Sequence, residues 1–373
     1  LRMPFREHSR QPKSFSERSK MRNKISALLV VFCLCLFLTR PVPAHAYALS
    51  KGEVVMEVMS GRVLHEKNPD EKLPMASTTK IVTAITVIEN CDINNEIIVP
   101  ESCTGVEGSS VYLKAGERYK IIDLLYGLML RSGNDAAETL AVGVGGSMEG
   151  FVKLMNETAK KAGAFNSAFK NPHGLPDKGH YTTASDLAKI SCYAMKNDFF
   201  RKIVSEKTYT ATELTCGEKK IWKNKNKMLF NFEGANGIKT GYTVKAGRCL
   251  VSSAIRKGME LVAVVLDSPQ MFERSSELLE NAYSEFNLVK IIDPERFDNI
   301  IFDKNKKNIY KLSKPEKFIY PVGKNEKIVC DVNFDSFAEE SVGINEKVGE
   351  IKIYCSKQLI FSQNIYTLSM HTN

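Results

Sequence analysis

Residues 73–84 read LPMASTTKIVTA, and this stretch decides how the rest of the chain is interpreted. Pro74 precedes a helical run that extends to Asn90, so the sequence predicts a helix that begins at Ser77. Side chains three residues apart share one face of a helix, so Lys80 Nζ can reach Ser77 Oγ. A serine hydroxyl is a poor nucleophile until a base removes its proton. The pair therefore predicts an activated serine.

Two further short motifs follow in a fixed order, Ser132-Gly133-Asn134 and Lys239-Thr240-Gly241. Each motif is weak alone, because S-x-x-K recurs at 167–170 and S-x-N recurs at 362–364, although K-T-G occurs once. Only the set that starts at residue 77 has all three motifs in this order. The order therefore favours a catalytic serine over a plain helix start with a solvated lysine.

The residue types suit acyl transfer. A lysine acts as a base only when burial or a second cation lowers its pKa, and Lys239 is the expected cation for Lys80. Ser132 can relay a proton to a leaving amine. Asn134 is expected to cap a helix and also to hold Lys80 and a substrate amide.

The third motif is expected on an edge strand over residues 237–243. Lys239 and Thr240 offer a cation and a hydroxyl to a carboxylate. Gly241 is expected to keep the strand surface open for a docking substrate.

The remaining pattern indicates an α/β protein. A hairpin is expected over residues 54–65, a loop over 171–181, and helices over 121–145 (with a Ser-Gly break), 148–162, 183–195 and 271–286. Strands are expected over 237–243, 248–255 and 259–267. Short β-rich runs follow from about residue 290, which predicts a domain boundary near 288.

Several other residues have structural interpretations. Tyr112 and Tyr126 are expected to pack in the core. His173 and His180 are expected to shape the loop over residues 171–186 rather than to transfer protons in a reaction.

The N-terminal segment explains the basic charge of the chain. The formal net charge is +9, but residues 1–46 hold nine Lys or Arg and two Asp or Glu, which leaves about +2 for the rest. This distribution argues against nucleic-acid binding. A basic start, the apolar run 25–38 and Ala44-His45-Ala46 predict a cleaved Sec-type export signal. The mature protein is therefore expected outside the cytoplasm, secreted or associated with the cell envelope.

The three motifs with their flanks, such as GLMLRSGNDAA and GANGIKTGYTVKAGRCLVSSA, resemble the penicillin-binding protein and serine β-lactamase superfamily. The closer resemblance is to the low-molecular-weight serine D-Ala-D-Ala carboxypeptidases, the peptidase S11-like family. It implies a β-lactamase/transpeptidase-like domain, with an antiparallel sheet flanked by helices, over residues 47–287. A small all-β C-terminal domain would occupy 288–373, after the signal segment 1–46.

The resemblance also implies roles for individual residues. Ser77 would be acylated, Lys80 would be the general base, and Ser132 would complete the catalytic set. The oxyanion hole would be the backbone N–H groups of Ser77 and Tyr242. The residues implied to bind substrate are Asn134, Lys239, Thr240, Gly241, Tyr242 and Arg274, the last through a substrate carboxylate.

The implied reaction removes the terminal D-Ala from peptidoglycan pentapeptide stems, with β-lactam antibiotics as inhibitors. No E-x-x-x-N occurs between Ser132 and Lys239, which argues against an efficient class A β-lactamase. A D,D-endopeptidase and a β-lactam- or wall-binding protein without turnover stay open as alternatives. No metal and no organic cofactor is expected. Many members of the family end in an amphipathic helix that lies on the membrane, whereas residues 357–373 read as a strand and a polar tail. This argues against anchoring through the C-terminus, and peripheral membrane association of another kind stays open.

Overall fold

The computed structural model describes residues 50–302, 308–334 and 342–372. The expected export signal over residues 1–46 lies outside the described residues. Within the described part, no helix has both the length and the apolar character needed to cross a membrane.

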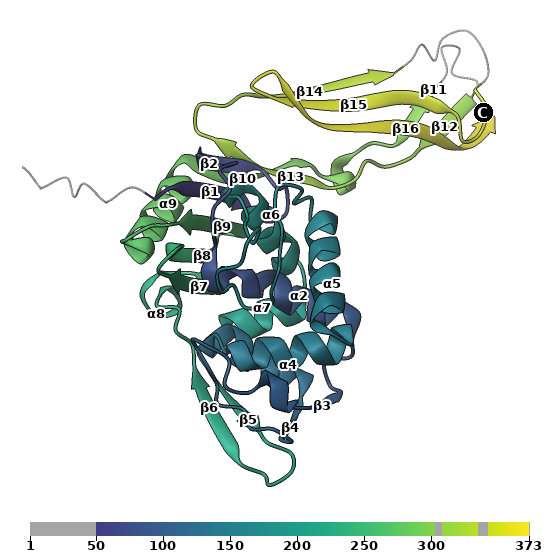
Figure 1. Ribbon diagram of the computed structural model, residues 1–373. Coiled ribbons are helices and arrows are strands. Elements are labelled where there is room, and N and C mark those ends of the chain that lie inside the picture. The colour runs from purple at the N-terminus through teal and green to yellow at the C-terminus, as the bar shows by residue number, and fades with distance from the viewer. Residues whose placement is uncertain (1–49, 303–307, 335–341, 373) are drawn as a thin grey trace, which may run out of the picture. The chain divides into compact units, whose positions relative to one another are not determined.

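A five-stranded antiparallel sheet forms the centre of the first part of the chain (Figure 1). Its strands, in spatial order, are β2 (Val63–Lys67), β1 (Gly52–Glu57), β9 (Met259–Leu266), β8 (Gly247–Arg256) and β7 (Ala235–Thr243). Every residue of β9 is buried, because helices cover both faces of the sheet. The strand β7, which carries the K-T-G motif, lies at an edge of this sheet, as expected.

The two faces of the sheet carry separate apolar clusters. One face packs against α2 (Lys80–Asn90), α6 (Ala184–Met195) and α7 (Asp198–Ser205). The other face packs against α9 (Met271–Glu285), and α8 (Met228–Asn231) contacts β7. Alternation along β1 divides the faces, since Val54 and Met56 belong to the first cluster and Val55 to the second.

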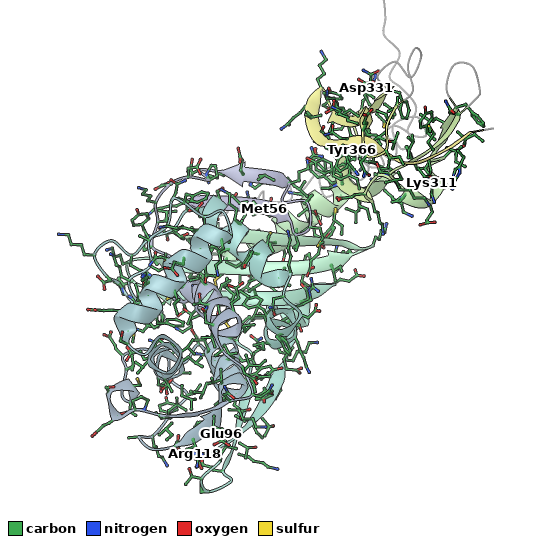
Figure 2. The ribbon with its side chains drawn as sticks, turned by 90° about the vertical axis from the view of Figure 1, so that its right-hand side faces the viewer. Met56, Glu96, Arg118, Lys311, Asp331 and Tyr366 are labelled. Atoms are coloured by element: carbon green, nitrogen blue, oxygen red, sulfur yellow. The ribbon has the colours of Figure 1, made fainter. Side chains whose placement is uncertain are left out.

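The remaining helices pack around α2. They are α3 (Ile121–Tyr126), the π-helical turn η3 (Gly127–Arg131), α4 (Asn134–Gly145) and α5 (Met148–Lys161). Two small hairpins accompany them, β3 (Glu96–Ile98) with β4 (Arg118–Lys120) and β5 (Thr208–Thr212) with β6 (Lys219–Lys223). Glu96 and Arg118 form an ion pair across the first of these hairpins (Figure 2).

The C-terminal part is all-β. A pair, β10 (Phe286–Ile292) with β13 (Phe318–Gly323), accompanies a five-stranded antiparallel sheet. The sheet contains β11 (Ile300–Phe302), β12 (Asn308–Leu312), β16 (Gln358–Thr372), β15 (Lys347–Cys355) and β14 (Ile328–Phe334). This part has its own apolar cluster. The expected fold class, a mixed α/β domain with an antiparallel sheet and a C-terminal all-β domain, is confirmed.

One expectation about the helices needs correction. The predicted helix start at Ser77 is a 3-10 turn, η1 (Ala76–Thr79), and α2 begins only at Lys80. The stretch 121–145 is helical on both sides of a Ser-Gly break, as expected, with the π-helical turn η3 just before the break and Ser132 in a left-handed conformation with φ of 65°. Thr183 is the N-cap of α6, since its side chain accepts a hydrogen bond from the N–H of Asp186 at 3.0 Å.

Candidate active site

Lys80 Nζ is at the centre of the candidate site. It lies 3.3 Å from Ser77 Oγ, 2.6 Å from Asn134 Oδ1 and 2.9 Å from the carbonyl oxygen of His173. Lys80 is completely buried, whereas Ser77 is half-buried and open to a reactant. The η1 turn and the first residue of α2 thus hold a serine hydroxyl next to a buried amine.

The environment of Lys80 favours the neutral amine. Its pKa is well below the usual value, first because burial disfavours the charge and then because Lys239 and Lys225 repel it. The oxygens of Asn134 and His173 can only accept, so they take the two N–H groups of a neutral amine. The lone pair then faces Ser77 Oγ, the one neighbour that can donate. The geometry therefore suits removal of the Ser77 proton.

Asn134 is held in one orientation. Its Nδ2 donates to the carbonyl oxygen of Glu107, so Oδ1 is the atom turned toward Lys80. Its backbone N–H donates to the carbonyl oxygen of Ser109 at 2.7 Å. The expectation that Asn134 caps a helix is wrong, because Gly133 is the N-cap residue of α4 and Asn134 is its first residue.

Ser132, which directly follows the π-helical turn, has a left-handed backbone conformation with φ of 65°. A left-handed φ is rare for a residue with a side chain, and this one sits directly before the turn into α4. Ser132 is buried, and its Oγ makes no hydrogen bond with any residue in the described part of the chain. A buried hydroxyl without a partner is costly, and strained residues of this kind gather at functional sites.

Lys239 is a second buried lysine on β7. Its Nζ donates to the carbonyl oxygen of Thr240 at 3.1 Å, and its side chain is 1% exposed. Burial, with a smaller contribution from the charge of Lys225, lowers the pKa of Lys239 to about 7. Thr240 is half-buried beside it. β7 packs against both η1 and η3, which brings the third motif to the other two.

Gly241 is required by close packing of two backbones. A Cβ at this position would lie 2.9 Å from the backbone nitrogen of Ser77 and 3.1 Å from the carbonyl oxygen of Met75. Contacts this short with backbone atoms cannot be relieved by a rotamer change. The expected reason, an open strand surface for substrate, is therefore replaced by the approach of β7 to η1. The side chain of Tyr242 points to solvent and is 64% exposed.

Two cationic side chains outside the three motifs, those of Lys225 and Arg131, also influence the site. Lys225, just after β6, lowers the pKa of both Lys80 and Lys239. Its own pKa is lowered by burial and by Arg131, and its Nζ donates to Ser109 Oγ at 3.3 Å. No local sequence pattern distinguishes Lys225 from neighbouring lysines, so only the fold shows its place.

The loop over residues 171–181 packs directly against the Ser77 turn. A Cβ at Gly174, which has φ of 90°, would lie 1.9 Å from the carbonyl oxygen of Ala76. His180 Nδ1 accepts from the N–H of Lys170, so His180 Nε2 carries the proton and donates to Thr79 Oγ1 at 3.0 Å. Burial lowers the pKa of His180 to about 4.

His173 is held in a similar way. Burial lowers its pKa to about 3, with repulsion by Lys80 as the second cause. Both histidines are buried in the loop, as their expected structural role requires, and their lowered pKa values favour neutral rings.

Arg274 is not brought to this site. It lies on α9, and its guanidinium donates to both carboxylate oxygens of Glu53, at 2.9 and 2.7 Å, and to Glu277. Glu53 shares the side of β1 that faces α9 with Val55, whereas Ser77 is on the α2 side of the sheet. The expectation that Arg274 binds a substrate carboxylate at this site is therefore wrong. Its guanidinium is paired with the buried Glu53 on the other face of the sheet.

The two tyrosines also differ from each other. Tyr126 packs as expected, stacked on Tyr209 with ring centroids 3.6 Å apart. Tyr112 is 80% exposed with φ of 60°, so the expectation that it packs in the core is wrong. The backbone N–H groups of Val111 and Leu113 bind the carboxylate of Asp135, which turns the residue between them outward.

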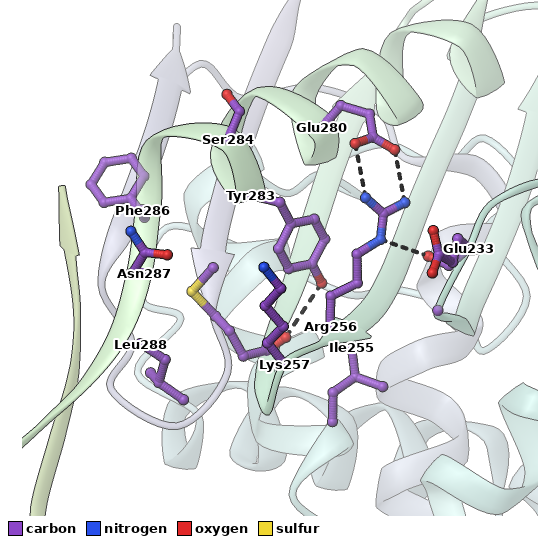
Figure 3. A pocket seen from close by; sticks show the side chains of 12 residues that line it. Glu233, Ile255, Arg256, Lys257, Glu280, Tyr283, Ser284, Phe286, Asn287 and Leu288 are labelled. Carbon is purple, nitrogen blue, oxygen red and sulfur yellow. Dashed lines mark hydrogen bonds and ion pairs between the residues drawn. The ribbon is translucent and has the colours of Figure 1, made fainter. Parts of the chain in front are cut away.

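A pocket of about 640 Å³ lies away from the three motifs, between α9 and the β8–β9 turn (Figure 3). Arg256 is its main charged group, and both guanidinium ends bind Glu280, at 2.8 and 2.7 Å, while Nε donates to the carbonyl oxygen of Glu233. The hydroxyl of Tyr283 donates to the carbonyl oxygen of Ala254 at 2.6 Å. These polar groups are already satisfied within the protein, and the residues that line the pocket include none of the three motifs.

Comparison with known proteins agrees with this geometry. The D-alanyl-D-alanine carboxypeptidase DacF of Bacillus subtilis is 35% identical over 246 residues, which cover 64% of this chain and 63% of that protein. DacC of Escherichia coli, another D-alanyl-D-alanine carboxypeptidase, is 34% identical over 287 residues, 72% of this chain and 70% of that protein. The match therefore spans slightly less than two thirds of the Bacillus relative.

Solved structures share the fold. Penicillin binding protein 5 of Haemophilus influenzae superposes with a TM-score of 0.72 at 26% identity, over 86% of this chain and 96% of that one. The Streptomyces K15 DD-transpeptidase gives a TM-score of 0.58 at 33% identity, over 62% and 94%. The model of the peptidase S11 family, described as D-alanyl-D-alanine carboxypeptidase, matches residues 41–270. Since this match covers more than half of the sequence, the chain belongs to the peptidase S11 family of D-alanyl-D-alanine carboxypeptidases.

Proposed function

We propose that this chain is a serine D,D-carboxypeptidase that removes the terminal D-Ala from peptidoglycan pentapeptide stems through an acyl-enzyme on Ser77. One observation carries the proposal. The buried Lys80 amine has two neighbours that can only accept hydrogen bonds and one, Ser77 Oγ, that can donate. Its lowered pKa makes the neutral base more accessible than in an ordinary lysine. The family membership of the chain supports the same reaction.

In the acylation step, Ser77 Oγ attacks the carbonyl carbon of the D-Ala–D-Ala peptide bond while Lys80 Nζ takes the hydroxyl proton. The carbonyl π electrons move onto oxygen and form a tetrahedral oxyanion. When the oxyanion collapses, the C–N bond breaks and the electron pair leaves with the nitrogen of the terminal D-Ala. That nitrogen receives the proton from Lys80 through Ser132 Oγ, which has no competing hydrogen bond among the described residues. The remaining stem is an ester of Ser77.

In the deacylation step, water attacks the ester carbonyl and gives one proton to Lys80. Collapse of the second tetrahedral species breaks the ester C–O bond, and Lys80 returns the proton to Ser77 Oγ. The products are the shortened stem and free D-Ala. Lys80 is thus neutral at the start and the end of the cycle, as its burial favours.

Substrate groups are assigned as follows. Lys239 and Thr240 bind the terminal carboxylate, because a buried cation without a carboxylate partner gains most from an incoming anion. The backbone N–H groups of Ser77 and Tyr242 form the oxyanion hole, and Asn134 holds a substrate amide. β-Lactams acylate the same serine. We also propose that the enzyme acts outside the cytoplasm, with residues 47–287 as the catalytic domain and 288–373 as an accessory domain.

The test is D-Ala release from a diacetyl-Lys-D-Ala-D-Ala peptide, with labelled penicillin as a parallel probe. Ser77→Ala is the matched control, since it removes one oxygen atom and leaves the turn intact. We expect release and labelling in the native protein and neither in the variant. Labelling without release of D-Ala contradicts the carboxypeptidase assignment and favours the endopeptidase or the binding protein without turnover. Release that persists in Ser77→Ala excludes the acyl-enzyme.

A further inference from the structure

A row of lysines extends from the candidate active site along residues 223–227. Lys223, Lys225 and Lys227 are exposed, while the intervening Asn224 and Asn226 are buried, at 7% and 1% exposure. The alternation places three ammonium groups on one side of the segment. Lys223 is the last residue of β6, and Lys227 directly precedes α8.

The buried asparagines hold this arrangement in place. Asn226 Nδ2 donates to the carbonyl oxygen of Gly237 at 2.9 Å, and its Oδ1 accepts from the N–H of Met228. Asn224 Nδ2 donates to the carbonyl oxygen of Glu206 at 3.0 Å, and its Oδ1 accepts from the N–H of Asn226. Because both amides are fixed by the backbone, the lysines between and beside them are directed outward.

An exposed phenylalanine adds a fourth lysine to the row. Phe230 is 44% exposed, and Lys207 Nζ and Lys223 Nζ lie 5.3 and 5.5 Å from its ring centroid. Lys227 Nζ lies 5.8 Å from the ring of Phe272. Aromatic faces let cations gather without neutralising their charge. We call the group Lys207, Lys223, Lys225 and Lys227 the lysine ridge.

The ridge carries charge that the protein does not neutralise. Within the part of the chain that the structure describes, none of its four lysines forms an ion pair, whereas nearby Lys220 is paired with Glu117 at 3.1 Å. Residues 47–373 as a whole have a formal charge of only about +2. The ridge is therefore a local concentration of positive charge on a chain that is otherwise nearly balanced.

We propose that the lysine ridge binds a linear polyol phosphate, a polymer that carries one phosphate in each repeating unit and no bases. Four ammonium groups on neighbouring segments suit a chain of several negative charges, and lysine is a common phosphate ligand. A nucleic acid also carries one phosphate in each repeat, but the nearly balanced charge of residues 47–373 argues against it. In combination with the proposed function, the bound polymer would hold the enzyme on the cell wall with Ser77 beside the stem peptides. The binding itself does not depend on that function.

The test uses fluorescently labelled poly(glycerol phosphate) and the full chain in an anisotropy titration over a series of salt concentrations. The variant is Lys207→Gln/Lys223→Gln/Lys227→Gln, which leaves Lys225 beside the catalytic groups untouched. Removing three phosphate contacts should reduce the slope of log K against log salt by about 2. Trp222, the only tryptophan, lies next to Lys223, so its emission provides a second, label-free readout.

The matched control is Lys153→Gln/Lys160→Gln/Lys324→Gln, which removes the same charge from exposed lysines outside the ridge. Equal weakening in both triple variants, or no change in the ridge variant, would overturn the proposal. Polyglutamate of similar length that binds the native protein as tightly as poly(glycerol phosphate) would overturn the phosphate assignment. The single variant Lys223→Gln repeats the test if the triple variant does not fold. Retained D-Ala release by the ridge variant separates this proposal from the proposed function.

Discussion

Lys80 Nζ lies closer to Asn134 Oδ1, at 2.6 Å, than to Ser77 Oγ, at 3.3 Å. The amide is oriented by the carbonyl oxygen of Glu107, which occupies its N–H side. Asn134 therefore fixes the position of the amine with a neutral acceptor, and it adds no negative charge that would hold the proton on Lys80. An asparagine here supports the depressed pKa that a lysine base requires.

Replacing Asn134 with Asp should move the pH dependence of acylation to higher pH. A carboxylate next to Lys80 favours the ammonium form, so the pKa of Lys80 rises and the neutral base appears only at more alkaline pH. The acylation rate at pH 7 should fall by more than tenfold and should partly recover as the pH rises. The measurement is the rate of labelled penicillin incorporation from pH 5 to pH 10.

Asn134→Ala is the control for this change. It removes the hydrogen bond without adding charge, so the rate should fall without an alkaline displacement of the profile. Identical pH profiles for the two variants would show that a charge at position 134 does not change the pKa of Lys80.

Gly241→Ala should slow acylation with little effect on the fold. The added methyl group meets the backbone nitrogens of Ser77 and Thr78 and the carbonyl oxygen of Met75, at 2.9 to 3.1 Å, so β7 must move away from η1. A misplacement of about 1 Å at a reacting centre costs on the order of 100-fold in rate, and the smaller shift expected here should cost less than that. Acylation rate and thermal unfolding should be measured together. An unchanged rate would show that the approach of β7 to Ser77 is unimportant.

The sequence predicts the part of this site that depends on short spacing. Ser77 and Lys80 are three residues apart, so one helical turn brings them together even though the turn is 3-10 before Lys80 and α-helical after it. The edge position of the K-T-G strand also follows from local pattern, because three strand-like runs with short connections form adjacent strands.

Features that depend on long-range packing do not follow from the sequence. Lys225 lowers the pKa of Lys80, which is 145 residues away in the sequence, and of Lys239, which is 14 residues away. No sequence motif surrounds Lys225, so the sequence does not predict this effect. Arg274 was expected at the substrate carboxylate, but the partner that captures it, Glu53, is in the first strand of the sheet. That Glu53 faces α9 can be predicted only after the residues of β1 have been assigned to the two faces of the sheet.

Arg274→Leu should destabilise the protein and leave acylation unchanged. Glu53 is completely buried, and Arg274 is its main cationic partner, with His65 Nε2 at 3.0 Å. Removing one partner of a buried pair costs up to about 3–5 kcal/mol, and the hydrogen bond that His65 keeps to Glu53 should offset part of this cost. Urea unfolding gives the free energy, and penicillin labelling gives the activity. Normal stability with a raised KM for the peptide would restore the carboxylate-binding role.

The double variant Glu53→Gln/Arg274→Leu controls for lost packing. It removes both charges, so most of the lost stability should return. Equal destabilisation in the single and double variants would attribute the effect to the volume of the arginine side chain.

The pH profile of kcat/KM for the D-Ala-D-Ala peptide should be bell-shaped. Lys80 must be neutral to accept the Ser77 proton, so activity rises as pH passes its lowered pKa. Lys239 must be protonated to attract a carboxylate, so activity falls as pH rises through its pKa of about 7. Lys239→Arg keeps the charge at all relevant pH values and should remove this alkaline limb. An alkaline limb that persists in Lys239→Arg would assign it to another group.

Lys225→Met should displace both limbs of this bell toward higher pH. The charge of Lys225 lowers the pKa of Lys80 and of Lys239 by repulsion, so its removal raises both values. Lys80 then becomes neutral only at higher pH, while Lys239 stays charged to higher pH. Methionine keeps the length of the side chain and loses the charge, whereas Lys225→Arg keeps the charge and should leave the profile in place. Because 1 M salt shortens the Debye length to about 3 Å, the same displacement should appear, more weakly, in the native enzyme at high salt. A Lys225→Met profile that coincides with the native one would show that the charge of Lys225 does not set the pKa of either buried lysine.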